Sequence, residues 1–302
     1  MPHNTNIQAY IMLTFVTWGW GCNTILAKIA VDQISPMMLV SLRWLALLVL
    51  LLIFSHRQIV KDYPVIRQHL IYFALMGTIG FTLFNALYYA AAHTTSAINI
   101  GIIQGSTPVF VFIGSYLFLS TRMTFLQMLG ASVTLVGVVV VATKGELNQL
   151  ERLTFNLGDL FILIACFFYA IYSIGLTRRP KIAPLSLFTI LAGFAFIASL
   201  PLLMIEIQYQ GIQTPTITGW VVVALVTLLP SLVSQLLYIH AVGLVGPGRS
   251  GMFVNLVPIF ASIMAVLYLG EHFENFHAIS LVLVLCGILL AEFGKANTTQ
   301  TT

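Results

Sequence analysis

Three polar side chains stand close together in an otherwise apolar stretch of the sequence. Asn85, Tyr88 and Tyr89 are spaced i, i+3 and i+4, so a helix places them on one face. Amide and phenol groups hydrogen-bond a solute without bringing a net charge into the protein interior. Polar groups deep in an apolar segment indicate a ligand site, with hydrogen bonding between helices as the alternative. We expect this face to bind a small polar solute.

The amide and the phenol recur 150 residues later, as Gln235 and Tyr238. The same shift aligns glycines and prolines, in the pairs Gly101 with Gly251, Pro108 with Pro258, and Gly137 with Gly287. Coincidences of these residue types at one shift indicate an internal structural repeat. We expect the two amide–phenol pairs to converge on one site.

A proline stands inside an apolar segment in each copy, with a glycine seven residues before it. Proline removes a backbone donor and leaves carbonyl groups without partners, so a kink can expose polar backbone to a cavity. A kink that serves packing alone is the alternative. The residues expected to gate the site, or to bind solute beside the kink, are Gly101, Gln104, Pro108, Gly251, Asn255 and Pro258.

One cation, Arg43, lies within an apolar segment, where an unpaired charge is costly. It must pair, face water or bind an anion, and a structural role is equally open. In the first apolar segment Trp20 and Asn23 share a helical face, so the indole can stack on a solute. Asp and Glu are absent from the middle of the apolar segments. A carboxylate proton relay is therefore not expected, while exchange or coupling through a histidine stays open.

The elements that carry these residues are long apolar helices. The chain of 302 residues is 59% hydrophobic and only 7% charged, against about 25% charged in soluble domains. Lipid must therefore be the solvent for most of it. A membrane-spanning helix needs roughly 20 apolar residues. Runs of that kind predict ten spans, at 8–30, 36–54, 69–92, 97–119, 125–143, 158–176, 185–205, 218–241, 248–269 and 277–293.

Each half of the chain supplies five of these spans. Because five is odd, the second copy must enter the membrane from the opposite side, and the basic loop 55–68 indeed corresponds to an acidic stretch around Glu206. We expect an all-α integral membrane protein with two inverted five-helix repeats, 1–143 and 158–302, joined by a periplasmic linker at 144–157. Lys and Arg gather in alternate loops, which places both termini in the cytoplasm of a bacterium and the spans in its inner membrane.

Short segments in both halves resemble a known family. WGCN at 20–23 and LRW at 42–44 are similar to the opening of an EamA domain, and STPVF at 106–110 to its fourth helix, with LVPIF at 256–260 as the counterpart. The first half departs at Ser120-Thr121, where a Gly-Glu pair is often found. The chain thus resembles the EamA branch of the drug/metabolite transporter superfamily. The resemblance implies helices around a central cavity, the fifth and tenth at the periphery, and export of amino acids or related metabolites.

Inverted repeats are typical of secondary transporters, because two near-equivalent packings can open one site to either side. We expect export of small metabolites, amino acids or derivatives above all, by alternating access. A multidrug efflux pump is the alternative, and a membrane scaffold or enzyme ranks lower because no nucleophile–base set or metal-ligand spacing is present. No cofactor, metal or nucleic acid is expected. The expected partners are the metabolite, membrane lipid and a proton or exchanged solute, for a monomer or weak homodimer.

Overall fold

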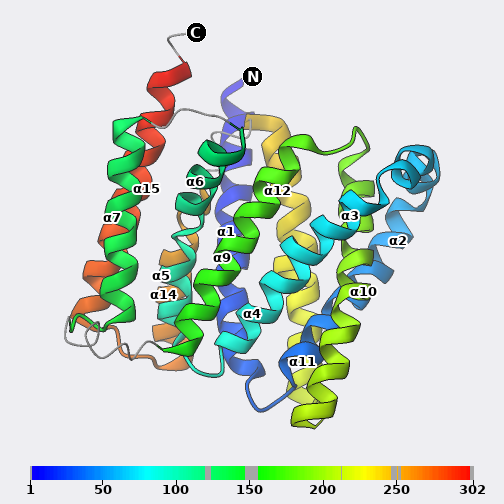
Figure 1. The fold of residues 1–302 in the computed structure, drawn as a ribbon, viewed down its shortest axis with the longest axis horizontal. Helices are drawn as coiled ribbons and strands as arrows, with labels where there is room; N and C mark the ends of the chain where they lie inside the picture. The colour runs from blue at the N-terminus through cyan, green and yellow to red at the C-terminus, as the bar shows by residue number, and fades with distance from the viewer. Residues whose placement is uncertain are drawn as a thin grey trace.

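The computed structural model describes residues 2–119, 124–146, 156–211, 213–245, 250 and 253–299, and these residues form helices and connecting turns without a strand. Figure 1 shows the helices side by side in one bundle. In chain order they are α1 (Pro2–Ala30), α2 (Pro36–Gln68), α3 (Leu70–Gly77), η1 (Thr78–Leu83), α4 (Phe84–Ala91), α5 (Ala97–Gln104), α6 (Thr107–Leu119), α7 (Phe125–Ala142), α9 (Leu157–Gly175), η2 (Leu176–Arg178), α10 (Pro184–Gln210), α11 (Ile217–Val226), η3 (Thr227–Val233), α12 (Ser234–Val245), α14 (Val257–Leu269) and α15 (Asn275–Thr299).

Within the described residues, seven helical stretches are long and apolar enough to cross a membrane. They are Pro36–Gln68, Leu70–Ala91, Ala97–Leu119, Phe125–Ala142, Leu157–Arg178, Pro184–Tyr209 and Ile217–Val245. Val257–Leu269 and Asn275–Ala291 are apolar but shorter. α1 has 29 residues but includes polar ones such as Asn23 and Lys28, and it is not among the seven. The chain is therefore a multi-pass membrane protein, and the count of ten spans stays a prediction.

The stretch predicted to be a loop at 55–68 is helical, so that expectation was wrong, and the polar tail after Phe293 is helical as well. The expected loop 55–68 continues α2 to Gln68, with Pro64 inside the helix. The tail after Phe293 continues α15 to Thr299. Both stretches follow directly on a long apolar helix, and extending an existing helix fixes only one residue for each hydrogen bond gained. The predicted linker at 144–157 lies largely outside the described residues.

A π-helical segment interrupts two of the spans at matching places. η1 separates α3 from α4, and η3 separates α11 from α12, with Pro230 inside it. Their first residues, Thr78 and Thr227, lie 149 residues apart, close to the shift that aligns the two halves. π segments are rare and recur at functional sites. Here each one directly precedes a segment with the amide–phenol pair.

α2 and α10 pack side by side, and each contributes a carboxylate to the start of the other. The Glu206 carboxylate accepts hydrogen bonds from the backbone N–H groups of Met37 (3.1 Å) and Met38 (3.3 Å) at the start of α2. The Asp62 carboxylate accepts one from the N–H of Ala183 (3.0 Å), directly before α10. Negative charge at a helix N-terminus is stabilising. The two caps lie at opposite ends of the helix pair, so α2 and α10 are antiparallel.

α7 and α15 lie together at one edge of the bundle (Figure 1). They approach closely because glycines face each other there. A Cβ placed on Gly130 would lie 2.4 Å from the carbonyl oxygen of Gly287, which leaves no room for a side chain. This pair forms the edge of the bundle on that side and packs inward against α5.

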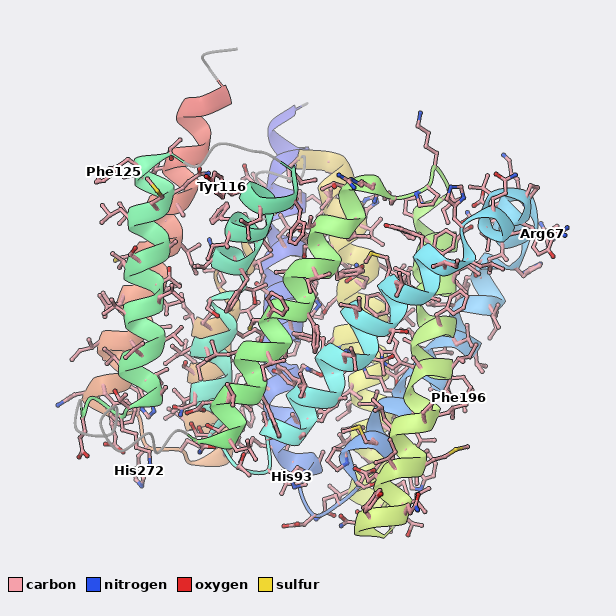
Figure 2. The ribbon with its side chains drawn as sticks, in the orientation of Figure 1. Arg67, His93, Tyr116, Phe125, Phe196 and His272 are labelled. Atoms are coloured by element: carbon pink, nitrogen blue, oxygen red, sulfur yellow. The ribbon has the colours of Figure 1, made fainter. Side chains whose placement is uncertain are left out.

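α1 begins and α15 ends at the same end of the bundle, which we call the termini end (Figure 1). Arg67, Tyr116 and Phe125 lie toward this end in Figure 2, while His93 and His272 lie at the opposite one, which we call the His93 end. A helical bundle entered and left at one end is crossed an even number of times. This arrangement agrees with the even number of spans that the sequence predicts.

Candidate functional site

A cavity of about 480 Å³ lies inside the bundle, lined by residues of α1, α2, η1, α4, α5, α6, α9, α10, η3, α12, α14 and α15. Small-molecule sites typically measure roughly 300 to 1,000 Å³. Most of the residues singled out from the sequence line it: Trp20, Asn23, Arg43, Asn85, Gln104, Pro108, Gln235, Tyr238, Asn255 and Pro258. They come from both halves of the chain, so the bundle brings residues more than 200 positions apart to one space.

Three of the predicted residues lie away from the cavity wall, and a fourth falls outside the described part of the chain. Tyr88 and Tyr89 are 1% and 2% exposed and pack behind the wall. Gly101 instead provides close contact with α14, because a Cβ there would lie 2.8 Å from the Cβ of Ala261. Gly251 is not among the described residues.

The two predicted prolines stand where helices restart. The helix beginning at Ala97 is interrupted at Gly105 and Ser106, and Pro108 lies in the first turn of α6. Pro258 holds the same place in the first turn of α14. Proline is well tolerated there because first-turn N–H groups have no helical partner. Both interruptions border the cavity.

Arg43 is buried against the cavity and bonded to neutral groups from three other segments. Its Nε donates to Ser231 Oγ (2.8 Å), and its Nη1 donates to Asn85 Oδ1 (2.7 Å), to Asn23 Oδ1 (3.4 Å) and to the hydroxyl of Tyr89. The Tyr89 hydroxyl in turn donates to Asn23 Oδ1 (3.0 Å). Within the described part of the chain, no Asp or Glu forms an ion pair with this guanidinium. The cluster therefore orients the charge without neutralising it.

The two amide–phenol pairs differ in their surroundings. Tyr88 shares a hydrogen bond of 2.7 Å with the hydroxyl of Thr24, and Asn85 is held by Arg43. Gln235 and Tyr238 are only half-buried and line the cavity. The Tyr238 ring packs against Trp20 with ring centroids 5.2 Å apart.

Sequence reasoning missed most of the aromatic wall and one polar contact. The missed lining residues include Trp44, Phe81, Phe84, Phe112, Tyr169, Tyr172, Ser173, Phe188, Pro230 and Ser231. Trp44 and Phe81 stack almost in parallel with centroids 4.7 Å apart, and Trp20 Nε1 donates to the carbonyl of Pro230 (3.2 Å). Aromatic residues in apolar segments look like ordinary core residues. Ser231, four positions before Gln235, does carry a usable signal, because a helix places both on one face.

The cavity lies nearer the termini end. α9 contributes lining from Tyr169 to Ser173, just before its last residue Gly175, and α10 contributes Phe188 one turn after its first residue. Both positions are near the termini end. At the other end, α5 contributes no described lining residue before Gln104, about two turns into the helix.

Carboxylates and a lysine tie the helices together at the His93 end. Glu271 accepts hydrogen bonds from the N–H groups of Ala97 (2.7 Å) and Ile98 (3.0 Å), which start α5. Lys28 Nζ donates to the carbonyls of Ala92 (2.7 Å) and Thr95 (3.0 Å). α5 itself is fully buried at Ile98. These contacts hold α1, α5 and the turn between α14 and α15 together at the end of the bundle away from most of the cavity lining.

Arg43 is the charged residue among those described around the cavity, and no histidine joins it. His93 lies in the turn between α4 and α5, where burial lowers the pKa of its imidazole and the nearby Asp32 carboxylate opposes that effect. Within the described residues, no group of three or more His, Cys, Asp or Glu side chains is placed to hold a metal ion. The site therefore offers hydrogen bonds, aromatic faces and one positive charge.

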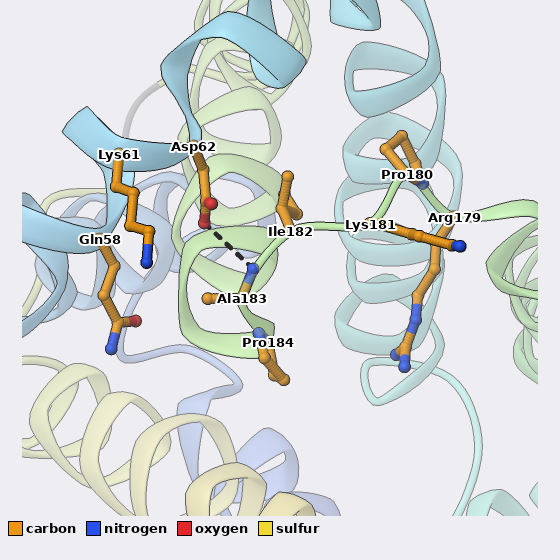
Figure 3. A pocket seen from close by; sticks show the side chains of 9 residues that line it. All are labelled: Gln58, Lys61, Asp62, Arg179, Pro180, Lys181, Ile182, Ala183 and Pro184. Atoms are coloured by element: carbon orange, nitrogen blue, oxygen red, sulfur yellow. Dashed lines mark hydrogen bonds between the residues drawn. The ribbon is translucent and has the colours of Figure 1, made fainter.

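A second pocket lies at the surface, at the start of α10, and shares no lining residue with the cavity. Figure 3 shows Lys61, Arg179 and Lys181 around it. Its one carboxylate, Asp62, is directed at the N–H of Ala183, which it caps. Asp62 is thus occupied in capping α10. The pocket also contains none of the residues that recur in the two halves.

Comparison with known proteins gives consistent results. The EamA-like transporter family matches the chain twice, at residues 7–143 and 156–293. The chain is 27% identical over 289 residues to the uncharacterized transporter YyaM of Bacillus subtilis, covering 95% of this chain and 94% of YyaM. It is 23% identical to the uncharacterized inner membrane transporter YedA of Escherichia coli K12, over 91% of this chain and 88% of YedA.

A solved crystal structure has the same fold, with a TM-score of 0.63 at 15% identity, over 96% of both chains. The two family matches together cover nearly all of the chain, and each contains one of the amide–phenol pairs. The chain belongs to the EamA-like transporter family and is a membrane transporter of the drug/metabolite type.

Proposed function

We propose that the protein is a secondary transporter that exports small metabolites, amino acids or their derivatives, across the inner membrane of a bacterium. One observation carries this proposal: a cavity inside the membrane-spanning bundle is lined by polar groups of both halves, and Gln235 and Tyr238 among them are free to bind a solute. Gln235 makes no side-chain hydrogen bond among the described residues. Its amide and the Tyr238 phenol can therefore bind a solute without first breaking internal bonds.

Alternating access follows from treating the halves as inverted copies of five helices each. Four features support this view. The family matches twice, π segments stand at matching places, the chain enters and leaves at one end, and the caps of α2 and α10 lie at opposite ends of that pair. Each half then has a near-equivalent packing available. Exchange between the two would expose the cavity to one end of the bundle and then to the other.

The cavity suits a small solute with both polar and apolar parts. Amides and phenols hydrogen-bond the polar part, while Trp20, Tyr238 and Phe112 offer ring faces to the apolar part. The lining described here contains no carboxylate for proton exchange. We therefore propose exchange or gradient-driven transport without a proton relay in the cavity.

Uptake by protein reconstituted into liposomes tests the proposal. A panel of labelled amino acids is supplied with and without a pH gradient, and at least one is expected to accumulate in exchange for the same solute inside. Changing both Gln235 and Tyr238 to Ala should abolish this exchange. Tyr209→Ala is the matched control, because Tyr209 is 79% exposed and far from the cavity lining. Unchanged exchange by the double variant would mean that the cavity is not the site.

Multidrug efflux is the second candidate, and the aromatic lining favours it. Aromatic faces bind apolar cations as well as apolar parts of metabolites. The same liposomes therefore receive an apolar cationic dye. Transport of the dye without transport of any amino acid would replace the first proposal with the second.

A further inference from the structure

The guanidinium of Arg43 is the one charge that the cavity wall presents among its described residues. Arg43 is 6% exposed, and each of its hydrogen-bond partners is neutral. A buried cation usually has an anionic partner, because removal from water favours pairing. Within the described residues this one has none. Among the residues that the structure describes, the interior of the transporter thus holds a positive charge without a counter-charge.

The hydrogen bonds of Arg43 leave one nitrogen of its guanidinium, Nη2, unused. Nε and Nη1 make the bonds to Ser231, Asn23, Asn85 and Tyr89. Nη2 has no partner among the described residues, and the side chain lines the cavity. A guanidinium has five N–H donors, and two of them belong to Nη2. Those donors are available to a group that enters the cavity.

The neighbours of Arg43 hold its orientation. The side chain is bonded through Nε and Nη1 to α1, α4 and η3, and its Cζ lies 5.2 Å from the Trp44 ring centroid and 5.8 Å from that of Tyr89. Fixed, partly used guanidinium groups bind carboxylates with a strong charge-assisted bond. The indole N–H of Trp44 is also buried without a partner. An entering anion would therefore meet a charge already in place.

We propose that Arg43 is the anchor for the carboxylate of the transported solute, and that a solute without a negative group is transported poorly. This inference rests on the proposed function and names the chemical class that the cavity selects. It assigns the two ends of the solute: the carboxylate lies at Arg43, and the rest of the molecule lies toward Trp20 and Tyr238. It also disfavours organic cations, since Arg43 repels them.

Three sets of labelled probes test the inference in liposomes containing the intact protein at pH 7. They are the L-amino acids, their N-acetyl derivatives and their amides. The first two keep the carboxylate, and the amides lose it. We expect uptake of at least one acid and of its N-acetyl derivative, with the matching amide weaker by roughly tenfold or more, the value of a charged hydrogen bond. Equal uptake of acid and amide would overturn the inference and leave the proposed function standing. Uptake of none of the three sets would overturn the proposed function and, with it, the inference.

Variants separate recognition from a structural role. Arg43→Gln should lower uptake of the acid by roughly tenfold or more and remove the preference for acid over amide, while Arg43→Lys should keep part of the preference. If Arg43 only stabilises the bundle, both variants would instead lower acid and amide uptake equally. The comparison of probes on the wild-type protein needs no variant, so it decides the question even if Arg43→Gln fails to fold.

Discussion

The two amide–phenol pairs share a spacing but not a task. Asn85 and Tyr88 in the first half are 4% and 1% exposed, and both are hydrogen-bonded inside the protein. Gln235 and Tyr238 in the second half are half-buried, and neither makes a side-chain hydrogen bond among the described residues. A duplicated pattern has thus divided into one copy that holds the interior together and one that faces the cavity.

The charge of Arg43 accounts for the different surroundings of Asn85 and Gln235. The shift of 148 that aligns Pro36 with Pro184 places Leu191 in the position of Arg43. Leu191 is 1% exposed and requires no polar neighbours, whereas Arg43 uses the oxygen atoms of Asn85 and Tyr89 as acceptors. A buried charge must be hydrogen-bonded. The first copy supplies those bonds, and the second copy stays free for the solute.

The largest change in stability should come from removing Asn85, one of the hydrogen-bond acceptors of Arg43. Asn85→Ala leaves a buried charged donor short of a partner, and we expect the free energy of unfolding to fall by about 3 kcal/mol. Gln235→Ala, the matched change in the second half, should cost less than about 0.5 kcal/mol, as is usual for a change that breaks no buried bond. Denaturant unfolding of both purified variants measures this difference. Equal losses of unfolding free energy would show that Asn85 and Gln235 stabilise the bundle to the same extent.

The next effect concerns the π segments. Gly80 in η1 corresponds to Pro230 in η3 at the shift of 150, and both line the cavity. A Cβ on Gly80 would lie 2.3 Å from the Tyr172 ring. Gly80→Ala must therefore displace that ring, and we expect a loss of about 2 kcal/mol in unfolding free energy from overpacking, together with reduced transport. Gly243→Ala is the control, because nothing lies within 4 Å of the added Cβ. If the two variants behave alike, η1 adapts more easily than its packing suggests.

The outcome at Tyr88 shows how far sequence could predict the site. The i, i+3, i+4 spacing correctly grouped Asn85 with Tyr88 and Tyr89, but it could not show which part of that face meets the cavity. The π segment just before them changes the direction in which the side chains of α4 point. No periodicity in the sequence predicts η1. Arg43 and Trp20 were predictable because a charge or an indole in an apolar segment is conspicuous. The phenylalanines of the wall were not, because they resemble core residues.

The fold was more predictable than the site. Long apolar runs fix where the helices lie, since lipid requires every backbone group to be bonded within the segment. The ends were harder to place, as at 55–68, because no solvent boundary forces a helix to stop where the membrane does. The capping of α2 by Glu206 could not be predicted either. It joins residues 169 positions apart through a contact that only the folded bundle creates.

A smaller effect distinguishes the two phenols. Tyr88→Phe removes the hydroxyl that Thr24 contacts at 2.7 Å, and both groups are buried. We expect the unfolding free energy to fall by about 1 kcal/mol, the usual value of one buried hydrogen bond. Tyr238→Phe should leave stability unchanged and alter transport, because Tyr238 lines the cavity and its hydroxyl makes no hydrogen bond among the described residues. Reversed results, with Tyr238→Phe the less stable protein, would contradict the division between the copies.

The smallest change in stability is expected at the caps of α2 and α10, where each half places a carboxylate at the start of a helix in the other half. Glu206→Gln keeps the shape of the side chain but removes the charge that faces Met37 and Met38, which should cost about 0.5 kcal/mol. Asp62→Asn should cost less, because Asp62 caps a single N–H and is only half-buried.

Hydrogen exchange of the amides at each helix start, followed by mass spectrometry, resolves changes of this size locally. Each variant should speed exchange at its own helix start and leave the other unchanged. Faster exchange at both starts would mean that the two ends of the pair are coupled, so that loosening one end also loosens the other. The two halves would then move as one unit. The difference between the two amide–phenol pairs would in that case concern solute binding alone.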